Sequence, residues 1–183
     1  MKLERSEALL VVIDLQEKLM PVIDGAAVVA GNVERLIRGC KILDVPVLVT
    51  EQYVKGLGPT IEPLRRALAE TSGSVPVEKA CFSSYGSAEF ETALRNTRRK
   101  QIVVCGVETH VCVYQTVMDL LAGGYEVSVV ADAVSSRAPH NRDIAIRRMT
   151  AEGAHLTSTE MCLFELLGTS GTEEFRAISR MVK

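Results

Sequence analysis

Cys112 is, by residue type and position, the best candidate in this chain for a reactive group. An apolar run at residues 102–105 predicts a buried strand, Gly106 breaks it, and helical apolar spacing begins at Val113. Cys112 is therefore expected in the first turn of a helix at the carboxyl end of a strand. The unpaired N–H groups and the helix dipole at such a point favour a thiolate. Cys112 is a candidate nucleophile, and a buried structural thiol is the alternative.

A cysteine nucleophile needs a base or a neighbouring cation, and two charged residues at predicted strand ends could provide them. Asp14 closes the apolar strand at 8–13 and could take the thiol proton. Lys79 lies at the end of a short strand, among apolar neighbours, and could stabilise a thiolate. Alternatively, Asp14 caps a turn and Lys79 pairs with a carboxylate at the surface. Cys81, two residues from Lys79, is the reserve nucleophile.

No metal or cofactor is expected. The three histidines, His110, His140 and His155, lack the His-x-His or His-x-x-x-His spacing of a metal site. His110 lies two residues from Cys112 on the predicted helix and hence on a nearly opposite face, so a direct Cys–His pair is not expected. The sequence contains no P-loop, no Gly-x-Ser-x-Gly elbow and no dinucleotide-binding fingerprint.

Composition and charge restrict the class of protein. A chain of 183 residues, 47% of them hydrophobic, is long enough for one globular domain, so a single domain over residues 1–183 is expected. A formal net charge of −2 without a basic stripe argues against a nucleic-acid partner. No apolar run approaches the roughly 18–20 residues of a membrane span, and residues 1–7 are too charged for a signal peptide. Five cysteines without zinc-site or Cys-x-x-Cys spacing indicate a reduced, cytoplasmic protein.

Apolar and amphipathic segments alternate along the chain. Buried strands are predicted at 8–13, 45–50, 101–105, 126–131 and 154–157, with a further short strand that ends at Lys79. Helices are predicted at 26–43, 87–97, 110–122, 140–152, 158–167 and 172–182. This alternation predicts a Rossmann-like, three-layer α/β/α architecture around a mostly parallel sheet.

Ligands of open parallel sheets bind at the carboxyl ends of the strands. That rule places Asp14, the turn at 106–112 and the segments 51–60 and 132–137 around one site. Segment 51–60 contains two glycines and a proline, and it is either a mobile cover over that site or an ordinary surface loop. The residues expected to recognise a small-molecule substrate are Gln52, Tyr53 and Arg137.

These motifs in this order resemble the isochorismatase-like cysteine hydrolase superfamily, to which nicotinamidases and N-carbamoylsarcosine amidases belong. The resemblance spans residues 11–167. It rests on Asp14 closing the first strand, Lys79 after the third, and Gly-Val-Glu-Thr-His-Val-Cys-Val at 106–113 before a long helix. Further stretches resemble the subgroup named for its isochorismatase domain: residues 50–53 with 55–60, 79–83 and 131–137.

The resemblance implies a catalytic triad of Cys112, Asp14 and Lys79. It also implies a cis peptide between Val107 and Glu108, which turns the main-chain N–H groups of Glu108 and Cys112 toward an oxyanion. In such a triad the aspartate takes the thiol proton, the lysine holds thiolate and carboxylate together, and the cysteine attacks a carbonyl carbon.

Two departures from relatives narrow the expected activity. Isochorismatases proper usually lack a cysteine at position 112, and nicotinamidases carry an Asp/His metal cluster where residues 51–60 contain no histidine. We therefore expect metal-independent hydrolysis of a small amide or related C–N bond through a thioester. The alternatives are a non-enzymatic oligomeric scaffold or binding protein with a vestigial triad, and a thiol redox protein that uses Cys112 or Cys81.

The last predicted helix bears on assembly. Phe175, Ile178 and Val182 form an apolar stripe on it, after a Gly- and Ser-containing hinge at 168–171. This stripe either docks on its own domain or crosses to a neighbouring copy. Relatives of this fold are often oligomers, so a homo-oligomer is expected.

Overall fold

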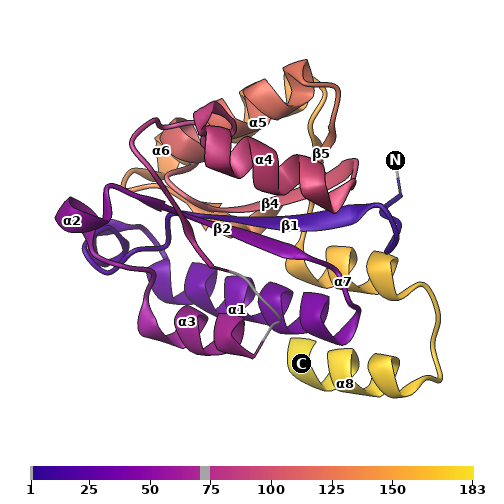
Figure 1. Ribbon diagram of the computed structural model, residues 1–183. Coiled ribbons are helices and arrows are strands. Elements are labelled where there is room, and N and C mark those ends of the chain that lie inside the picture. Colours follow the sequence, from indigo (N-terminus) through magenta and orange to yellow (C-terminus); the bar gives the residue numbers. More distant parts are fainter. Residues whose placement is uncertain (1, 71–74) are drawn as a thin grey trace.

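A sheet of parallel strands forms the centre of the computed structural model, which describes residues 2–70 and 75–183 (Figure 1). Its strands are β1 (Ala8–Ile13), β2 (Val47–Gln52), β3 (Val77–Lys79), β4 (Gln101–Val107), β5 (Glu126–Ser135) and β6 (His155–Thr157). Within the described ranges the sheet has six strands, in the order β3-β2-β1-β4-β5-β6. Helices cover both of its faces, which confirms the predicted three-layer α/β/α architecture.

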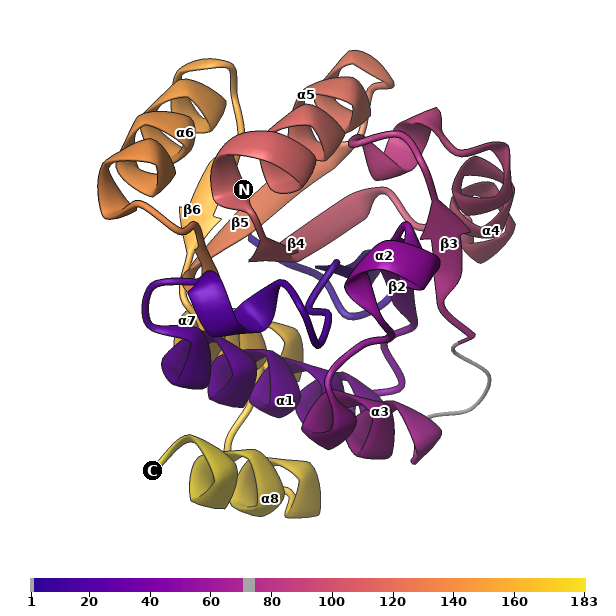
Figure 2. The ribbon, with the colours of Figure 1, turned by 90° about the vertical axis from the view of Figure 1, so that its left-hand side faces the viewer.

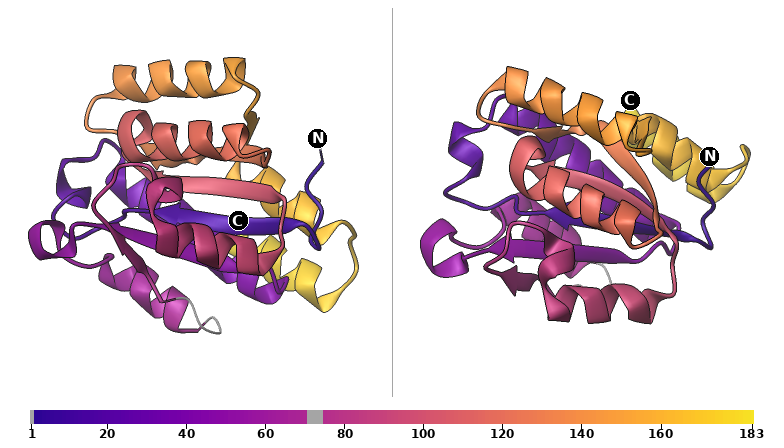
Figure 3. Two further views of the ribbon diagram at one scale, coloured as in Figure 1. Left: turned by 45° about the horizontal axis from the view of Figure 1, so that its top comes forward. Right: turned by 90° about the horizontal axis from the view of Figure 1, so that it is seen from above.

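Two groups of helices enclose the sheet. Their members, together with one short helix at the sheet edge, are α1 (Ala26–Ile42), α2 (Val54–Leu57), α3 (Glu62–Ala69), α4 (Ala88–Thr97), α5 (Tyr114–Ala122), α6 (Pro139–Ala151), α7 (Thr159–Leu167) and α8 (Glu173–Val182). Figures 1 and 3 show α4, α5 and α6 on one face and α1, α3 and α7 on the other, with α8 outside α1 and α7.

β1 lies at the centre of the core because its side chains alternate between the two helical layers. Leu10 and Val12 pack with the layer of α1, whereas Leu9, Val11 and Ile13 pack with the layer of α4 and α5. A strand covered on both faces appears in the sequence as a continuous apolar run, which is why this strand could be predicted. β1 pairs with β2 and β4, so its carboxyl end lies in the middle of the sheet edge.

β4 is longer than the sequence predicted. The prediction ended this strand at residue 105, but it continues through Gly106 to Val107. Gly106 has a φ of +128°, and a Cβ atom at this position would overlap the main chain of Ile13 in β1. The glycine therefore permits a close approach of two strands rather than ending one of them.

Two further segments differ from the prediction. β5 continues past Asp132 to Ser135, and the carboxylate of Asp132 accepts hydrogen bonds from the main-chain N–H (2.8 Å) and the hydroxyl (3.0 Å) of Thr159 at the start of α7. Helix α3 was not predicted. Pro63 in its first turn is a helix-start signal that the sequence did carry.

Segment 51–60 is built into the edge of the sheet. Gln16 is fully buried, and its Nε2 donates to the carbonyl oxygens of Gln52 (2.9 Å) and Gly58 (2.6 Å). The main-chain N–H of Gln52 donates in return to Oε1 of Gln16 (2.7 Å). These bonds hold the segment at two points, which favours a fixed wall over a mobile cover.

The apolar stripe of the last helix packs on its own chain. Ile178 is fully buried in the core cluster that includes α1, and the ring of Phe175 lies 6.3 Å from the ring of Phe164 in α7, centroid to centroid. The helix begins at a cap, because the hydroxyl of Thr172 accepts a hydrogen bond from the N–H of Phe175 (3.0 Å). Of the two placements considered for this stripe, the structure has the intramolecular one.

Replacing Gly106 with alanine should destabilise the protein, because the new Cβ meets the main chain of β1 and the backbone φ disfavours any L side chain. We expect the free energy of unfolding in urea to fall by about 2–4 kcal/mol. Gly124→Ala is the matched control, since Gly124 also has a positive φ (79°) but no atom lies within 4 Å of its Cβ position. The control should lose about 1 kcal/mol, and equal losses in the two variants would contradict the close-approach explanation.

Candidate active site

The carboxyl ends of β1, β3 and β4 lie along one edge of the sheet, which faces the reader in Figure 2. Asp14 follows β1, Lys79 is the last residue of β3, and Cys112 lies in the helical turn Thr109–Val113 between β4 and α5. These three residues are 0%, 3% and 6% exposed, respectively. The structure thus buries all three residues of the expected triad at the same edge.

The ammonium group of Lys79 is fully engaged. Its Nζ lies 2.7 Å from Oδ2 of Asp14, and both side chains are 0% exposed. The same nitrogen donates to Oε1 of Gln52 (2.8 Å) and contacts the carbonyl oxygens of Phe82 (3.1 Å) and Cys81 (3.4 Å). A buried ammonium group with a carboxylate and several oxygen acceptors is well compensated for the loss of water.

The carboxylate of Asp14 is held from a second side. Its Oδ1 accepts a hydrogen bond from Oγ1 of Thr50 (2.8 Å), which in turn accepts one from the hydroxyl of Ser84 (3.4 Å). Asp14 also has a φ of +55°, in the left-handed region that aspartate tolerates better than most side chains. The backbone turn and two neighbouring strands together fix the direction of this carboxylate.

The thiol of Cys112 is protonated at rest, which corrects the expectation that it leans toward a thiolate. Burial raises its pKa to about 12, and the charge and hydrogen bond of the Asp14 carboxylate act in the same direction. The Lys79 ammonium lowers the pKa and offsets part of this rise. Desolvation and the nearby carboxylate therefore outweigh the local dipole on which the expectation rested.

The loop after β3 is tied to the cysteine turn. The hydroxyl of Thr116 donates to the carbonyl oxygen of Cys112 (2.7 Å), and the main-chain N–H of Ser84 donates to the same hydroxyl (2.8 Å). The residues that supply carbonyl oxygens to Lys79 thus belong to a loop that is also anchored beside the nucleophile.

Glu108 lies between β4 and the cysteine turn. The peptide bond between Val107 and Glu108 is cis. Oε2 of Glu108 accepts hydrogen bonds from the main-chain N–H of Arg137 (2.9 Å) and from its Nε (3.1 Å). The Glu108 side chain is 9% exposed and that of Arg137 is 63% exposed, so the pair runs from the buried site to the surface.

The structure places Gln52 and Tyr53 beside Lys79 in different ways. Both polar atoms of the Gln52 amide are engaged: Oε1 accepts from Lys79 (2.8 Å) and Nε2 donates to the carbonyl oxygen of Ala80 (2.7 Å). Tyr53 is 57% exposed, and its main-chain N–H donates to the carbonyl oxygen of Lys79 (3.0 Å). Gln52 thus supports the lysine directly, while the Tyr53 side chain remains open to a ligand.

Sequence reasoning missed four buried polar residues that organise this edge: Gln16, Thr50, Ser84 and Thr116. The signal that could have found two of them is position, because Gln16 and Thr50 lie close to the carboxyl ends of apolar runs. Among the other candidates, Cys81 contacts Lys79 only through its main-chain oxygen. Cys81 is exposed, and Nδ1 of His110 pairs with the hydroxyl of Ser136 at 3.0 Å. Residues 2–70 and 75–183 contain no group of three or more His, Cys, Asp or Glu side chains placed to hold a metal ion.

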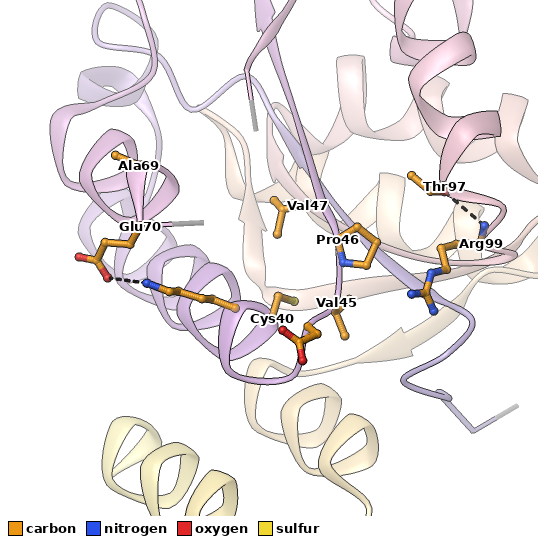
Figure 4. A pocket seen from close by; sticks show the side chains of 10 residues that line it. Cys40, Val45, Pro46, Val47, Ala69, Glu70, Thr97 and Arg99 are labelled. Atoms are coloured by element: carbon orange, nitrogen blue, oxygen red, sulfur yellow. Dashed lines mark hydrogen bonds and ion pairs between the residues drawn. The ribbon is translucent and has the colours of Figure 1, made fainter. Parts of the chain in front are cut away.

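A pocket of about 750 Å³ lies at the opposite, amino-terminal edge of the sheet (Figure 4). Its walls include Cys40 at the end of α1, Val47 at the start of β2, and Arg99 just before β4. Lys41 and Glu70 pair in its wall at 3.9 Å. None of the three triad residues lines it, so this pocket is separate from the candidate site.

Together, the fold and this edge define a three-layer α/β protein with a buried cysteine, aspartate and lysine at the carboxyl ends of its strands. A family model described as the isochorismatase domain matches residues 8–161. The chain therefore belongs to the isochorismatase family. Membership of this family supports a hydrolase-type function.

Similar proteins occur in distant organisms. The chain is 37% identical over 177 residues to the secreted isochorismatase effector Isc1 of Phytophthora sojae, covering 96% of this chain and 84% of that protein. It is 36% identical over 176 residues to mouse isochorismatase domain-containing protein 2A, covering 96% of this chain and 82% of that protein.

Solved structures share the fold closely. The MAR1 ribonuclease structure from Caenorhabditis elegans superposes with a TM-score of 0.93 at 35% identity, covering 100% of this chain and 92% of that one. YcaC from Pseudomonas aeruginosa, solved with hexane-2,5-diol and covalent acrylamide, superposes with a TM-score of 0.90 at 26% identity, covering 98% and 91%. In the part of the chain that the structure describes, no helix has the length and apolar character to cross a membrane.

Because the Asp14 carboxylate raises the pKa of the Cys112 thiol, Asp14→Asn should lower that pKa and increase the thiolate fraction at pH 8. We expect the alkylation of Cys112 by iodoacetamide at pH 8 to be faster in this variant than in the wild type. Lys79→Met should raise the pKa of the Cys112 thiol and slow its alkylation, because this change removes the cation that lowers the pKa.

The measurement is the rate of Cys112 alkylation between pH 6 and 10, followed by peptide mass spectrometry. Exposed Cys81 is the internal control for Asp14→Asn and should react at the same rate in this variant and the wild type. Slower alkylation of Cys112 in a folded Asp14→Asn variant across this range would contradict the assigned electrostatics.

Proposed function

We propose that residues 1–183 form a single domain of a cysteine-dependent hydrolase that cleaves a small amide or related C–N bond. The observation that carries this proposal is the burial of the Cys112 thiol at the same sheet edge as Asp14, whose carboxylate raises the pKa of the thiol and is paired with Lys79 at 2.7 Å. A thiol, a proton acceptor and a cation in this arrangement meet the needs of nucleophilic catalysis.

In the first step, Asp14 takes the thiol proton while the sulfur of Cys112 attacks the carbonyl carbon of the substrate. The π electrons of the carbonyl move to its oxygen and form a tetrahedral oxyanion. The main-chain N–H groups of Glu108 and Cys112 are the proposed donors to that oxyanion. A donor in such a position typically contributes about 3–4 kcal/mol to transition-state stabilisation.

In the second step, the oxyanion collapses, the C–N bond breaks, and protonated Asp14 gives its proton to the leaving nitrogen. The product of this step is a thioester of Cys112. Water then attacks the thioester carbonyl, and Asp14 accepts the proton that the water loses. Cleavage of the C–S bond releases the acid, and the proton returns to the sulfur.

The roles of the surrounding residues follow their contacts. We assign Gln52 to the positioning of Lys79, because both groups of its amide are already bonded within the protein. Tyr53 and Arg137 expose most of their side chains beside the site and remain the proposed substrate contacts.

A small molecule is the proposed substrate, rather than RNA. The name of the C. elegans neighbour raises the nucleic-acid alternative. In this chain, however, the reacting groups are buried and the formal net charge is −2, both of which disfavour a polyanion. Covalent acrylamide in the P. aeruginosa neighbour supports a nucleophile in this fold that accepts a small amide. A redox role for Cys112 has less support, because a buried thiol with a raised pKa is a poor target for oxidation.

We also propose that the protein is a homo-oligomer in the cytoplasm. Its five cysteines are free thiols, as a reducing compartment favours. Leu156 on the edge strand β6 and Met161 on α7 are 48% and 54% exposed, and large exposed apolar side chains of this kind suit a contact between copies.

Replacing Cys112 with alanine should abolish hydrolysis, because no other group in the proposed mechanism can form the thioester. The measurement is ammonia release from a panel of small amides, ureides and carbamoyl compounds; cleavage of single-stranded RNA is followed in parallel by the appearance of shorter fragments. For any compound that is turned over, we expect kcat to fall at least about 10³-fold in Cys112→Ala. Cys81→Ala is the matched control and should retain activity.

A covalent acyl-enzyme in the wild type, detected at Cys112 by mass spectrometry, would be the accompanying signature. Undiminished turnover by Cys112→Ala, or cleavage of RNA without cleavage of any small compound, would overturn the proposal.

A further inference from the structure

Glu108 has a buried carboxylate of which one oxygen is used by the protein and the other is not. Oε2 accepts two hydrogen bonds from Arg137. Among the described residues, Oε1 accepts none, although the side chain is 9% exposed. Oε1 is not among the fully buried atoms without a partner in the described residues, so it is accessible from outside and can accept from a ligand.

Glu108 is next to the proposed reaction centre in the chain. It directly precedes the helical turn that carries Cys112. Its charge raises the pKa of the thiol, but this effect is smaller than those of burial, Asp14 and Lys79. The carboxylate is therefore compatible with a nucleophile beside it and can serve the substrate.

The neighbouring arginine restricts what the free oxygen can bind. Arg137 contacts Oε2 through both its main chain and its side chain, which fixes the orientation of the carboxylate. The guanidinium also balances the charge of Glu108, so a neutral donor suits the free oxygen better than a metal ion or an ammonium group. An ionised carboxylate accepts hydrogen bonds and cannot donate them, so a group without an N–H or O–H gains nothing there.

We infer that Oε1 of Glu108 accepts a hydrogen bond from the amide N–H of a substrate held at Cys112. The residue thereby selects primary amides and terminal ureides over esters and tertiary amides. This inference rests on the proposed function, because it requires the carbonyl group of the substrate to lie beside the thiol. It gives the side chain of Glu108 a role in specificity. The mechanism above used only the main-chain N–H of this residue.

Two matched electrophiles test the inference without a known substrate. In 2-chloroacetamide and methyl 2-chloroacetate, the sulfur attacks the same carbon and displaces chloride, but only the amide offers an N–H. The second-order rates of Cys112 alkylation are measured by peptide mass spectrometry for the wild type, Glu108→Gln and Glu108→Asp. Each amide-to-ester ratio is divided by the ratio for glutathione, which removes the intrinsic reactivity of the probes.

We expect the wild type to favour the amide by about 10- to 100-fold after this correction. Glu108→Gln should lose most of the preference, while its reaction with the ester becomes faster because a negative charge near the thiol is gone. Glu108→Asp keeps the charge but withdraws the oxygen by one methylene, so it should lose the preference without the faster ester reaction.

An equal corrected ratio in all three folded proteins, with Cys112 alkylated in each, would overturn the role of Glu108 and leave the proposed hydrolase intact. If neither probe alkylates Cys112 in the folded wild type, the proposed function fails, and this inference falls with it.

Discussion

The buried ion pair of Lys79 and Asp14 is the interaction on which the candidate site depends. Its two charged atoms are 2.7 Å apart, and both side chains are 0% exposed. Taking two ions out of water costs several kcal/mol each, and their attraction offsets this cost when their other hydrogen-bonding groups are satisfied. Gln52 and the carbonyl oxygen of Phe82 accept from the ammonium, while Thr50 donates to the other carboxylate oxygen. The ends of β1, β2 and β3 therefore have to meet for the pair to exist.

The Lys79–Asp14 pair also explains how the protonated thiol of Cys112 could act as a nucleophile. Burial and Asp14 raise the pKa of Cys112, and Lys79 offsets part of the rise. In the proposed mechanism, proton transfer from sulfur to Asp14 moves a negative charge from one neighbour of Lys79 to another. The number of buried charges is unchanged by that step, so no additional ion has to be desolvated. In that mechanism the thiol stays protonated at rest, and sulfur loses its proton only as it attacks the carbonyl carbon.

The parts of the fold that the sequence predicted are those with continuous patterns of burial. β1 and β4 are apolar on both faces because helices cover both, so Asp14 and Cys112 could be placed at the carboxyl edge. The protonation state of the Cys112 thiol could not be predicted. It depends on the burial of the thiol and on the carboxylate of Asp14, which is far away in the sequence. The burial of Gln16 could not be predicted either. A glutamine is usually a surface residue, and the partners that satisfy this one lie 36 and 42 residues later in the chain.

A double-mutant cycle tests whether Lys79 and Asp14 act as one buried unit. The free energy of unfolding in urea is measured for the wild type, Asp14→Asn, Lys79→Met and the double variant; asparagine is chosen because it tolerates the φ of +55° at position 14. Each single change leaves a buried group without its partner and should cost about 3–5 kcal/mol. If the two side chains act as one unit, the double variant should lose at least about 2 kcal/mol less than the sum of the single changes. Additive losses would show that they do not depend on each other and would rule out the ion pair as the basis of the site.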